Sequence, residues 1–174
     1  MKLISPTQSF RITSGFGPRN IGGGASRNHR GVDIGVRSGT ITRAPKSGIV
    51  KTATFANNSC GGTIVIEHGP VAAIGGSMTT SYCHMKEIFV KVGQYVNKGQ
   101  EIGLTGGASN DKGRGNSLGP HLHFGVKKDG VFVDPEKYYK GGILRESLAI
   151  QGAQLAVIAL AAGSVVYIIQ KIIK

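Results

Sequence analysis

The chain has 174 residues, and its 28 glycines, its lack of tryptophan and its few long helical patterns argue against a mainly helical protein and favour strands joined by turns. Its 21 lysines and arginines outnumber its nine acids, and the formal charge of +12 suits either an anionic partner or a plainly solvated basic surface. Because the basic residues are scattered singly and no nucleic-acid-binding module is recognisable, no specific nucleic-acid partner is predicted.

The first 140 residues, 1–140, are predicted to form one domain of short antiparallel strands. Residues 63–67 are rich in β-branched side chains, and residues 79–85 are their expected antiparallel partner. Residues 106–119 form a loop rich in glycine, serine and asparagine, which either frames a binding site or is a plain connection. The other predicted elements, in chain order, are strands at 48–53, 90–96, 101–105 and 121–124 and a helical turn at 135–139.

The C-terminal part has a different composition. Residues 141–147 are predicted to be a hinge, residues 148–170 a transmembrane helix and residues 171–174 a basic tail. The predicted span has no charged residue, and a helix of that length extends roughly 33 Å, enough to cross the hydrocarbon core of a bilayer. The alternative is a buried or amphipathic helix, which we disfavour because polar residues do not recur along one face. Basic residues flank both ends, so the orientation stays undecided.

Two short histidine motifs carry the strongest chemical signal. They are His29-x-x-x-Asp33 and His121-x-His123, and they hold three of the five histidines. Imidazole and carboxylate together suit zinc, and a catalytic zinc site uses three protein ligands and leaves one position open. Asp33 is also the single acid among residues 1–66, which favours a chemical role for it over a role in solubility. Ordinary hydrogen-bonded histidines remain the alternative.

The spacing of these motifs suggests a division of roles. His121 and His123 lie two residues apart on a predicted strand, so they face the same side at about 7 Å from each other. We expect one of them to bind the metal and the other to stand beside an activated water. Since no glutamate lies near either motif, the acid–base roles fall to His84 and His121. One neutral histidine would accept the proton of the water, and a second would stabilise the developing oxyanion.

A series of short segments in a fixed order is more specific than any single motif. The segments lie between about residues 13 and 140, at 14–19, 29–34, 61–69, 82–85, 92–100, 119–124 and 134–135. Through them the chain resembles the lysostaphin-type (LytM-like) zinc endopeptidases, a class of peptidoglycan hydrolases.

The resemblance implies a mainly β, antiparallel domain of the duplicated hybrid motif type, with an open substrate groove and one Zn²⁺ per chain. It assigns the metal-ligand roles to His29, Asp33 and His123, and the catalytic roles to His84 and His121, in agreement with the division suggested by spacing. His68 lies outside the ligand set and is interpreted as a structural residue at the end of a strand.

Two features depart from the family pattern. Gly125 stands where the family often has glutamate, which would alter the polarity of the groove without removing a ligand. The loop at 106–119, with Asp111, Lys112 and Arg114, is longer than usual and borders the predicted site. We expect this loop to influence substrate choice.

The two cysteines, Cys60 and Cys83, lie at the ends of two strands predicted to pair. An antiparallel register brings these ends together, so a disulfide is feasible and would indicate an oxidising location or an extracellular particle. A thiol nucleophile at Cys83 beside His84 is the weaker alternative, because it requires an activated thiolate and His84 already has a role.

The predicted function is zinc-dependent hydrolysis of peptide crosslinks in bacterial peptidoglycan by an enzyme anchored in a lipid bilayer through its C-terminal helix. The N-terminus has no apolar stretch typical of a signal peptide, so we favour the membrane of a bacteriophage virion as its location, with local wall opening during entry or lysis. A bacterial envelope enzyme that remodels the wall is the alternative. The rival functional class is a catalytically silent module that binds peptidoglycan or activates another hydrolase. All five expected site residues are present, which favours the enzyme.

Overall fold

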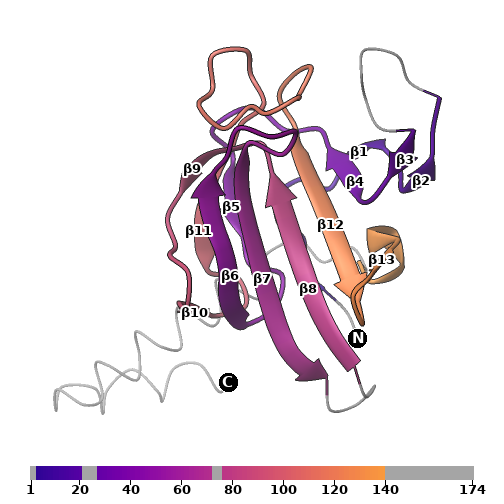
Figure 1. Ribbon diagram of the computed structural model, residues 1–174, viewed down its shortest axis with the longest axis vertical. Coiled ribbons are helices and arrows are strands. Elements are labelled where there is room, and N and C mark those ends of the chain that lie inside the picture. Colours follow the sequence, from indigo (N-terminus) through magenta and orange to yellow (C-terminus); the bar gives the residue numbers. More distant parts are fainter. Residues whose placement is uncertain (1–2, 21–26, 72–75, 140–174) are drawn as a thin grey trace, which may run out of the picture.

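The computed structural model describes residues 3–20, 27–71 and 76–139, and these residues form β-strands and a single turn of 3-10 helix, η1 (Pro135–Lys137) (Figure 1). One large sheet contains β1 (Ile12–Ser14), β4 (Val32–Ile34), β6 (Gly48–Phe55), β7 (Gly62–Val71), β8 (Gly76–Cys83), β10 (Tyr95–Val96), β12 (Leu122–Lys128) and β13 (Val131–Val133). A smaller sheet contains β5 (Ile41–Arg43), β9 (Met85–Ile88) and β11 (Glu101–Thr105), and a two-stranded pair contains β2 (Gly17–Pro18) and β3 (Asn28–His29).

The strand order in the large sheet is β1-β4-β12-β8-β7-β6-β10, and β13 pairs with the later part of β12. Each pairing between the strands is antiparallel, which confirms the predicted mainly β, antiparallel fold. Figure 1 shows β6, β7, β8 and β12 running side by side through the centre. The order places β4, β12 and β8 next to one another although they are far apart in the sequence.

Alternation of side chains along β12 separates the core from the site. Leu122, Phe124 and Val126 are buried in the hydrophobic core, and His123 lies between them on the opposite face of the sheet. A slip of β12 by one residue would exchange the two sets, and burying one such apolar side chain contributes about 1.5–3 kcal/mol. The packing of the core therefore fixes the register of β12, and this register places His123 on the face opposite the core.

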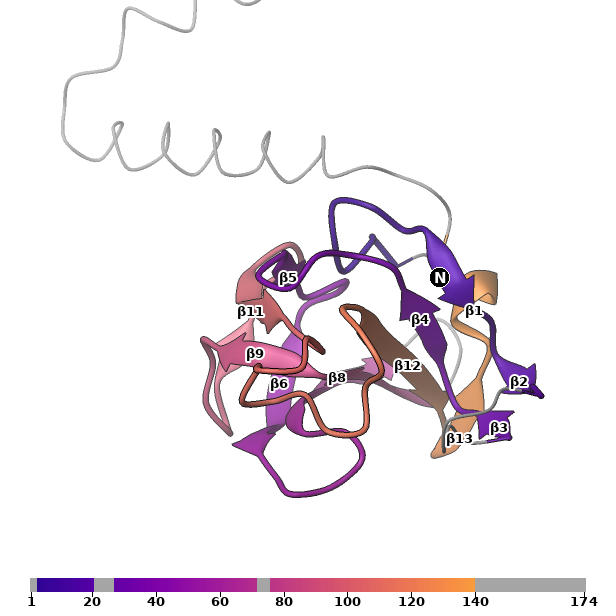
Figure 2. The same ribbon diagram turned by 90° about the horizontal axis from the view of Figure 1, so that it is seen from above.

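The smaller sheet helps to cover the apolar face of the large one. Ile102 of β11 and Met85 of β9 belong to the same buried cluster as Ile64 and Ile66 of β7. In the view from above, β5, β11 and β9 lie along one side of the domain, and β12 runs between β8 and β4 (Figure 2). The opposite face of the large sheet is thereby left for the site.

Two of the predicted strands are wrong in part. The strand predicted at 79–85 ends at Cys83, because His84 takes a left-handed φ of 61° and Met85 begins β9 in the other sheet. The strand predicted at 90–96 is mostly a turn, in which Gly93 has a φ of 84° and only Tyr95 and Val96 pair with β6. The predictions at 48–53, 63–67, 101–105 and 121–124 correspond to β6, β7, β11 and the start of β12, with His121 just before that strand, and the helical turn corresponds to η1.

The predicted hinge at 141–147, the predicted transmembrane helix at 148–170 and the tail at 171–174 lie outside the described residues. Within residues 3–20, 27–71 and 76–139 there is no helix long and apolar enough to cross a membrane.

Candidate active site

Strand pairing brings the predicted site residues into one cross-strand row. Asp33 of β4 lies directly opposite His123 of β12, and His123 lies opposite Cys83 of β8. Directly opposed residues project to the same face of an antiparallel sheet. Asp33, His123 and Cys83 therefore meet on the face that does not carry the core.

His29 reaches the same point from the short strand β3. After β3, the backbone at Gly31 lies directly against β12. A β-carbon at Gly31 would lie 2.5 Å from the carbonyl oxygen of Phe124 and 2.9 Å from the imidazole of His123. Only glycine allows β4 and β12 to come this close. The buried His29 ring is held by its Nδ1–H, which donates to the carbonyl of Gly15 at 2.7 Å, so its Nε2 presents a lone pair to the site.

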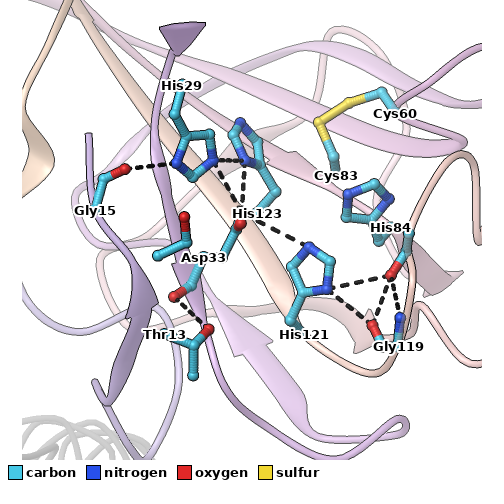
Figure 3. A network of polar contacts seen from close by, with 12 residues as sticks. Thr13, Gly15, His29, Asp33, Cys60, Cys83, His84, Gly119, His121 and His123 are labelled. Carbon is cyan, nitrogen blue, oxygen red and sulfur yellow. Dashed lines mark hydrogen bonds and ion pairs between the residues drawn. A yellow bond between two sulfur atoms is a disulfide. The ribbon is translucent and has the colours of Figure 1, made fainter. Parts of the chain in front are cut away.

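The three predicted metal ligands converge on one point (Figure 3). Nε2 of His29 lies 3.0 Å from Oδ1 of Asp33 and 2.9 Å from Nδ1 of His123, which itself lies 2.9 Å from the same Oδ1. Donors around tetrahedral zinc, with bonds of about 2.0–2.1 Å, lie roughly 3.3 Å apart. Imidazole lone pairs and a carboxylate oxygen repel one another without a cation between them. The residues present therefore fit a zinc ion.

The carboxylate of Asp33 is kept ionised and oriented by its neighbours. Burial raises its pKa, but the close contacts with the imidazoles of His123 and His29 more than offset that effect and hold the pKa well below the ordinary value. Its second oxygen, Oδ2, accepts from Nη1 of Arg19 at 3.1 Å, and the same Nη1 donates to Oγ of Ser14 at 2.8 Å. Arg19 thus leaves Oδ1 to face the histidines.

His84 is placed by backbone contacts rather than by a strand. Its left-handed φ ends β8, and its N–H donates to the carbonyl of Cys60 at 2.8 Å. Its Nδ1–H donates to the carbonyl of Arg114 at 2.8 Å, which leaves Nε2 without the proton. Burial, followed by the nearby imidazole of His121, lowers the pKa of His84 to about 4, so the ring is neutral at pH 7. Cys60 and Cys83 form a disulfide beside it.

His121 is held in the same way by the loop that precedes it. Its Nδ1–H donates to the carbonyl of Gly119 at 2.8 Å and lies 3.1 Å from Oγ of Ser117. Its Nε2 lies 3.6 Å from Oδ1 of Asp33, and its ring centroid lies 4.7 Å from that of His84. In their neutral forms both histidines therefore present a lone pair, a proton acceptor, at the edge of the three-donor cluster. The oxyanion-stabilising role suggested for one of them requires that it first take up a proton.

All five predicted metal and catalytic residues line one hollow of about 730 Å³, together with both cysteines of the disulfide and the loop residues Asn116 to Pro120. The hollow is open to solvent. In Figure 3, His29 and His84 lie on opposite sides of His123 and His121. His68 does not line it. That histidine is buried in the core, where Nδ1 lies 3.0 Å from the carbonyl of Ser47 and Nε2 lies 2.8 Å from Oγ1 of Thr80.

Gly125 is not among the residues that line this hollow. A β-carbon there would lie 2.5 Å from Oγ of Ser81, which would have to move, and 3.2 Å from the carbonyl of Arg30. The expectation that glycine at this position alters groove polarity stays a prediction. No role is predicted from the sequence for Arg19, although it lies in the segment 14–19. The carbonyls of Gly15, Arg114 and Gly119 carry no side-chain signal from which their roles could be found.

Comparisons with known proteins agree with this geometry. The chain matches Peptidase family M23 over residues 27–135. It is 32% identical over 135 residues to the peptidoglycan DD-endopeptidase ShyC of Vibrio cholerae, in a match that covers 76% of this chain and 28% of that protein. The chain spans about a quarter of the length of the curated relatives it matches.

Two solved structures resemble the domain. A zinc-containing peptidase from Vibrio cholerae superimposes with a TM-score of 0.63 and 32% identity, covering 82% of this chain and 41% of that chain. The catalytic domain of lysostaphin from Staphylococcus simulans superimposes with a TM-score of 0.60 and 30% identity, covering 74% of this chain and 91% of that chain.

Proposed function

This chain belongs to peptidase family M23, and on that premise we propose that it is a zinc-dependent endopeptidase that hydrolyses peptide crosslinks of bacterial peptidoglycan. One observation carries the proposal: a three-donor cluster fit for zinc lines the same open hollow as two histidines whose Nδ1 atoms are held by backbone carbonyls. The relatives named above as a peptidoglycan DD-endopeptidase and as lysostaphin support the choice of substrate class.

His29, Asp33 and His123 are proposed as the zinc ligands. The chemistry that zinc supplies when bound is Lewis acidity, which makes water acidic enough to serve as a nucleophile near neutral pH and withdraws charge from a carbonyl oxygen. Arg19 holds Asp33 with one oxygen turned toward the histidines. The carbonyl of Gly15 fixes the tautomer of His29, as outer-shell acceptors commonly do at metal sites.

His84 and His121 are proposed as the residues that move the proton. The Nε2 atom of His121, 3.6 Å from Asp33, is the nearer acceptor for the proton of the attacking water. Once a proton has reached either ring, its Nε2–H can donate to the oxygen that gains charge or to the leaving amine. The carbonyls of Arg114 and Gly119 keep both Nδ1 atoms protonated, so Nε2 is the atom that exchanges the proton.

The test is digestion of purified peptidoglycan by the full chain, with and without a zinc chelator, followed by mass spectrometry of the released fragments. We expect cleavage of a D-alanyl–diamino-acid crosslink or of a glycine-rich bridge, its loss with chelator and its return on adding zinc. Zinc-loaded, folded protein that cleaves no wall chemotype would instead indicate the silent module that binds peptidoglycan or activates another hydrolase.

Membrane anchoring is a separate part of the proposal and rests on the uncharged, apolar sequence of residues 148–170. We propose that this segment holds the domain at a bilayer, either the membrane of a bacteriophage virion or a bacterial envelope. Alkaline carbonate extraction of the full chain from membranes tests the anchor, since an inserted helix stays in the pellet. Immunodetection in purified particles and in host envelopes separates the two locations.

A further inference from the structure

A second hollow of about 650 Å³ lies beside the active site, and the proposed catalytic mechanism does not use it. Two loops form it: residues 55–59, at the end of β6, and residues 112–116, in the long loop before β12. We refer to it as the side hollow. Its lining includes Lys112 and Arg114, two of the residues that make this loop unusual in the sequence.

The side hollow is continuous with the active site. Ser59 and Asn116 line both hollows, so the groove passes from the three-donor cluster over these two residues. A peptide whose scissile bond lies beside His121 and His123 therefore has its neighbouring groups within reach of the side hollow. A crosslinked peptide is long enough to occupy both.

The walls of the side hollow are fixed before any ligand binds. The N–H of Gly62 donates to the carbonyl of Gly113 at 2.9 Å, and the N–H of Asn116 donates to the carbonyl of Ser59 at 2.9 Å. A β-carbon at Gly61 would lie 2.3 Å from the carbonyl oxygen of Gly113, so only glycine lets the two loops lie this close. A preformed site loses little conformational entropy on binding.

The charge of the groove is strongly positive. Among the described residues that line the two hollows, Asp33 is the sole acid, and it faces the three-donor cluster. Lys112 is exposed, and its Nζ lies 4.6 Å from the centroid of the Phe55 ring, a cation–π contact that places the ammonium without neutralising it. Nε of Arg114 donates to the carbonyl of Ser117 at 2.9 Å, which likewise leaves the charge in place. In the part of the chain that the structure describes, neither cation is ion-paired with a carboxylate.

We propose that the side hollow is a carboxylate subsite, in which Lys112 and Arg114 bind a free carboxyl group of an acidic peptide next to the bond that is cut. This inference rests on the proposed function and narrows its substrate class. The acidic residues of peptidoglycan stem peptides are free carboxylates in some walls and carboxamides in others. The subsite selects the free-acid form, because a carboxamide offers no charge to the two cations.

The experiment uses a matched pair of crosslinked stem peptides, one with the glutamate α-carboxyl free and one with it amidated. For the full chain we expect kcat/KM to be higher for the free acid. Lys112→Gln should lower the ratio of the two kcat/KM values by roughly three- to tenfold, mainly through KM. Lys112→Arg, which keeps the charge, should restore most of the ratio. Lys91→Gln is the matched control, because it removes one exposed lysine that lines neither hollow.

A second measurement separates this inference from the proposed function. Calorimetric binding of the same two peptides to the chelator-treated full chain needs no turnover. Tighter binding of the free acid, lost in Lys112→Gln and kept in Lys91→Gln, supports the subsite even if no peptide is cleaved. Cleavage of both peptides with an unchanged ratio in Lys112→Gln would overturn the subsite and leave the peptidase proposal standing.

Discussion

The two halves of the site are held by different kinds of structure. In the proposed metal-binding half, made of His29, Asp33 and His123, each residue belongs to a strand, and Asp33 and His123 face each other in register. In the proposed proton-transfer half, made of His84 and His121, neither residue lies within a strand. Each is fixed by one backbone carbonyl of the loop at 106–119, those of Arg114 and Gly119. These are called the metal half and the proton half below.

Because of this difference, the geometry of each half depends on a different part of the molecule. The metal half shares its register with the apolar core of β12 and is therefore as secure as the sheet. The proton half depends on a glycine-rich loop and on the disulfide beside it. We expect substitutions to act on zinc retention in the first half and on turnover in the second.

The largest expected effect comes from removing one histidine of each half. His123→Ala should abolish zinc retention and activity, because two ligands do not hold a catalytic zinc. His121→Ala should keep zinc and lower kcat by about 10²–10⁴, the usual contribution of a general acid–base. Zinc content by mass spectrometry, measured beside turnover, checks both. Equal loss of zinc in the two variants would remove the distinction between the halves.

A second prediction concerns Gly31, whose lack of a side chain lets β4 and β12 come close in the metal half. Gly31→Ala should push β4 away from β12, because its β-carbon would lie 2.5 Å from the carbonyl of Phe124. We expect zinc affinity to fall by about 10–100-fold, the range seen when the support of a ligand is lost. Competition with a chromophoric chelator measures this. Gly15→Ala is the control, since a β-carbon there meets nothing within 4 Å. Equal affinities in the two variants would contradict the steric argument.

A third prediction concerns the disulfide and the proton half. Replacing Cys60 and Cys83 by serine removes the covalent link that holds residue 60 beside the N–H of His84, and it opens a loop with a sequence separation of 23. We expect stability to fall by about 3 kcal/mol and kcat to fall roughly tenfold at full zinc occupancy. Urea unfolding and turnover are the measurements. Loss of zinc instead of turnover would mean that the disulfide supports the metal half.

The smallest expected effect on the site is that of His68, which belongs to neither half and acts on stability alone. Burial lowers its pKa to about 4, so between pH 4 and pH 6.5 the unfolded chain binds the proton more readily than the folded chain. Its contribution to stability is full above pH 6.5 and is lost as the pH falls toward 4, on the order of 3 kcal/mol. His68→Gln should make urea midpoints depend less on pH over this range and leave zinc content unchanged. An unaltered pH dependence would show that other groups dominate.

Much of the metal half could be predicted from the sequence, because side-chain alternation and strand pairing express it directly. Leu122 and Phe124 mark a strand with one buried face, and that pattern puts His123 on the other. The left-handed φ of His84 could not be predicted, since nothing in the residues from 79 to 85 distinguishes a strand from a strand that ends one residue early. The apolar alternation from Val90 to Val96 wrongly predicted a strand for a related reason. Val90 and Val96 are buried at the two ends of a turn, whereas Val92 between them is 62% exposed.

The residues of the proton half could be predicted from the sequence, but their orientation could not. His84 and His121 were identified by elimination and by resemblance, yet the groups that hold them are main-chain carbonyls, which every residue has. Their orientation depends on how the loop at 106–119 folds, and this follows from contacts between loops rather than from local pattern. The clearest sign of these contacts in the sequence is the high glycine content of that loop and of the residues around Gly61, where backbone lies directly against backbone.

The cross-strand row of Asp33, His123 and Cys83 also determines when, during synthesis and folding, the site can form. Its members come from the beginning, the middle and the end of the domain, so a partly synthesised chain that has not reached β12 does not contain the complete site. Contacts between residues this distant in sequence form slowly, because a long loop must close before they repay its entropy. We therefore expect zinc to bind the finished fold and not its precursors, and by mass action to stabilise that fold alone. Of the three strands that supply this row, β12 is the last in the sequence, so it is the one that completes the cluster.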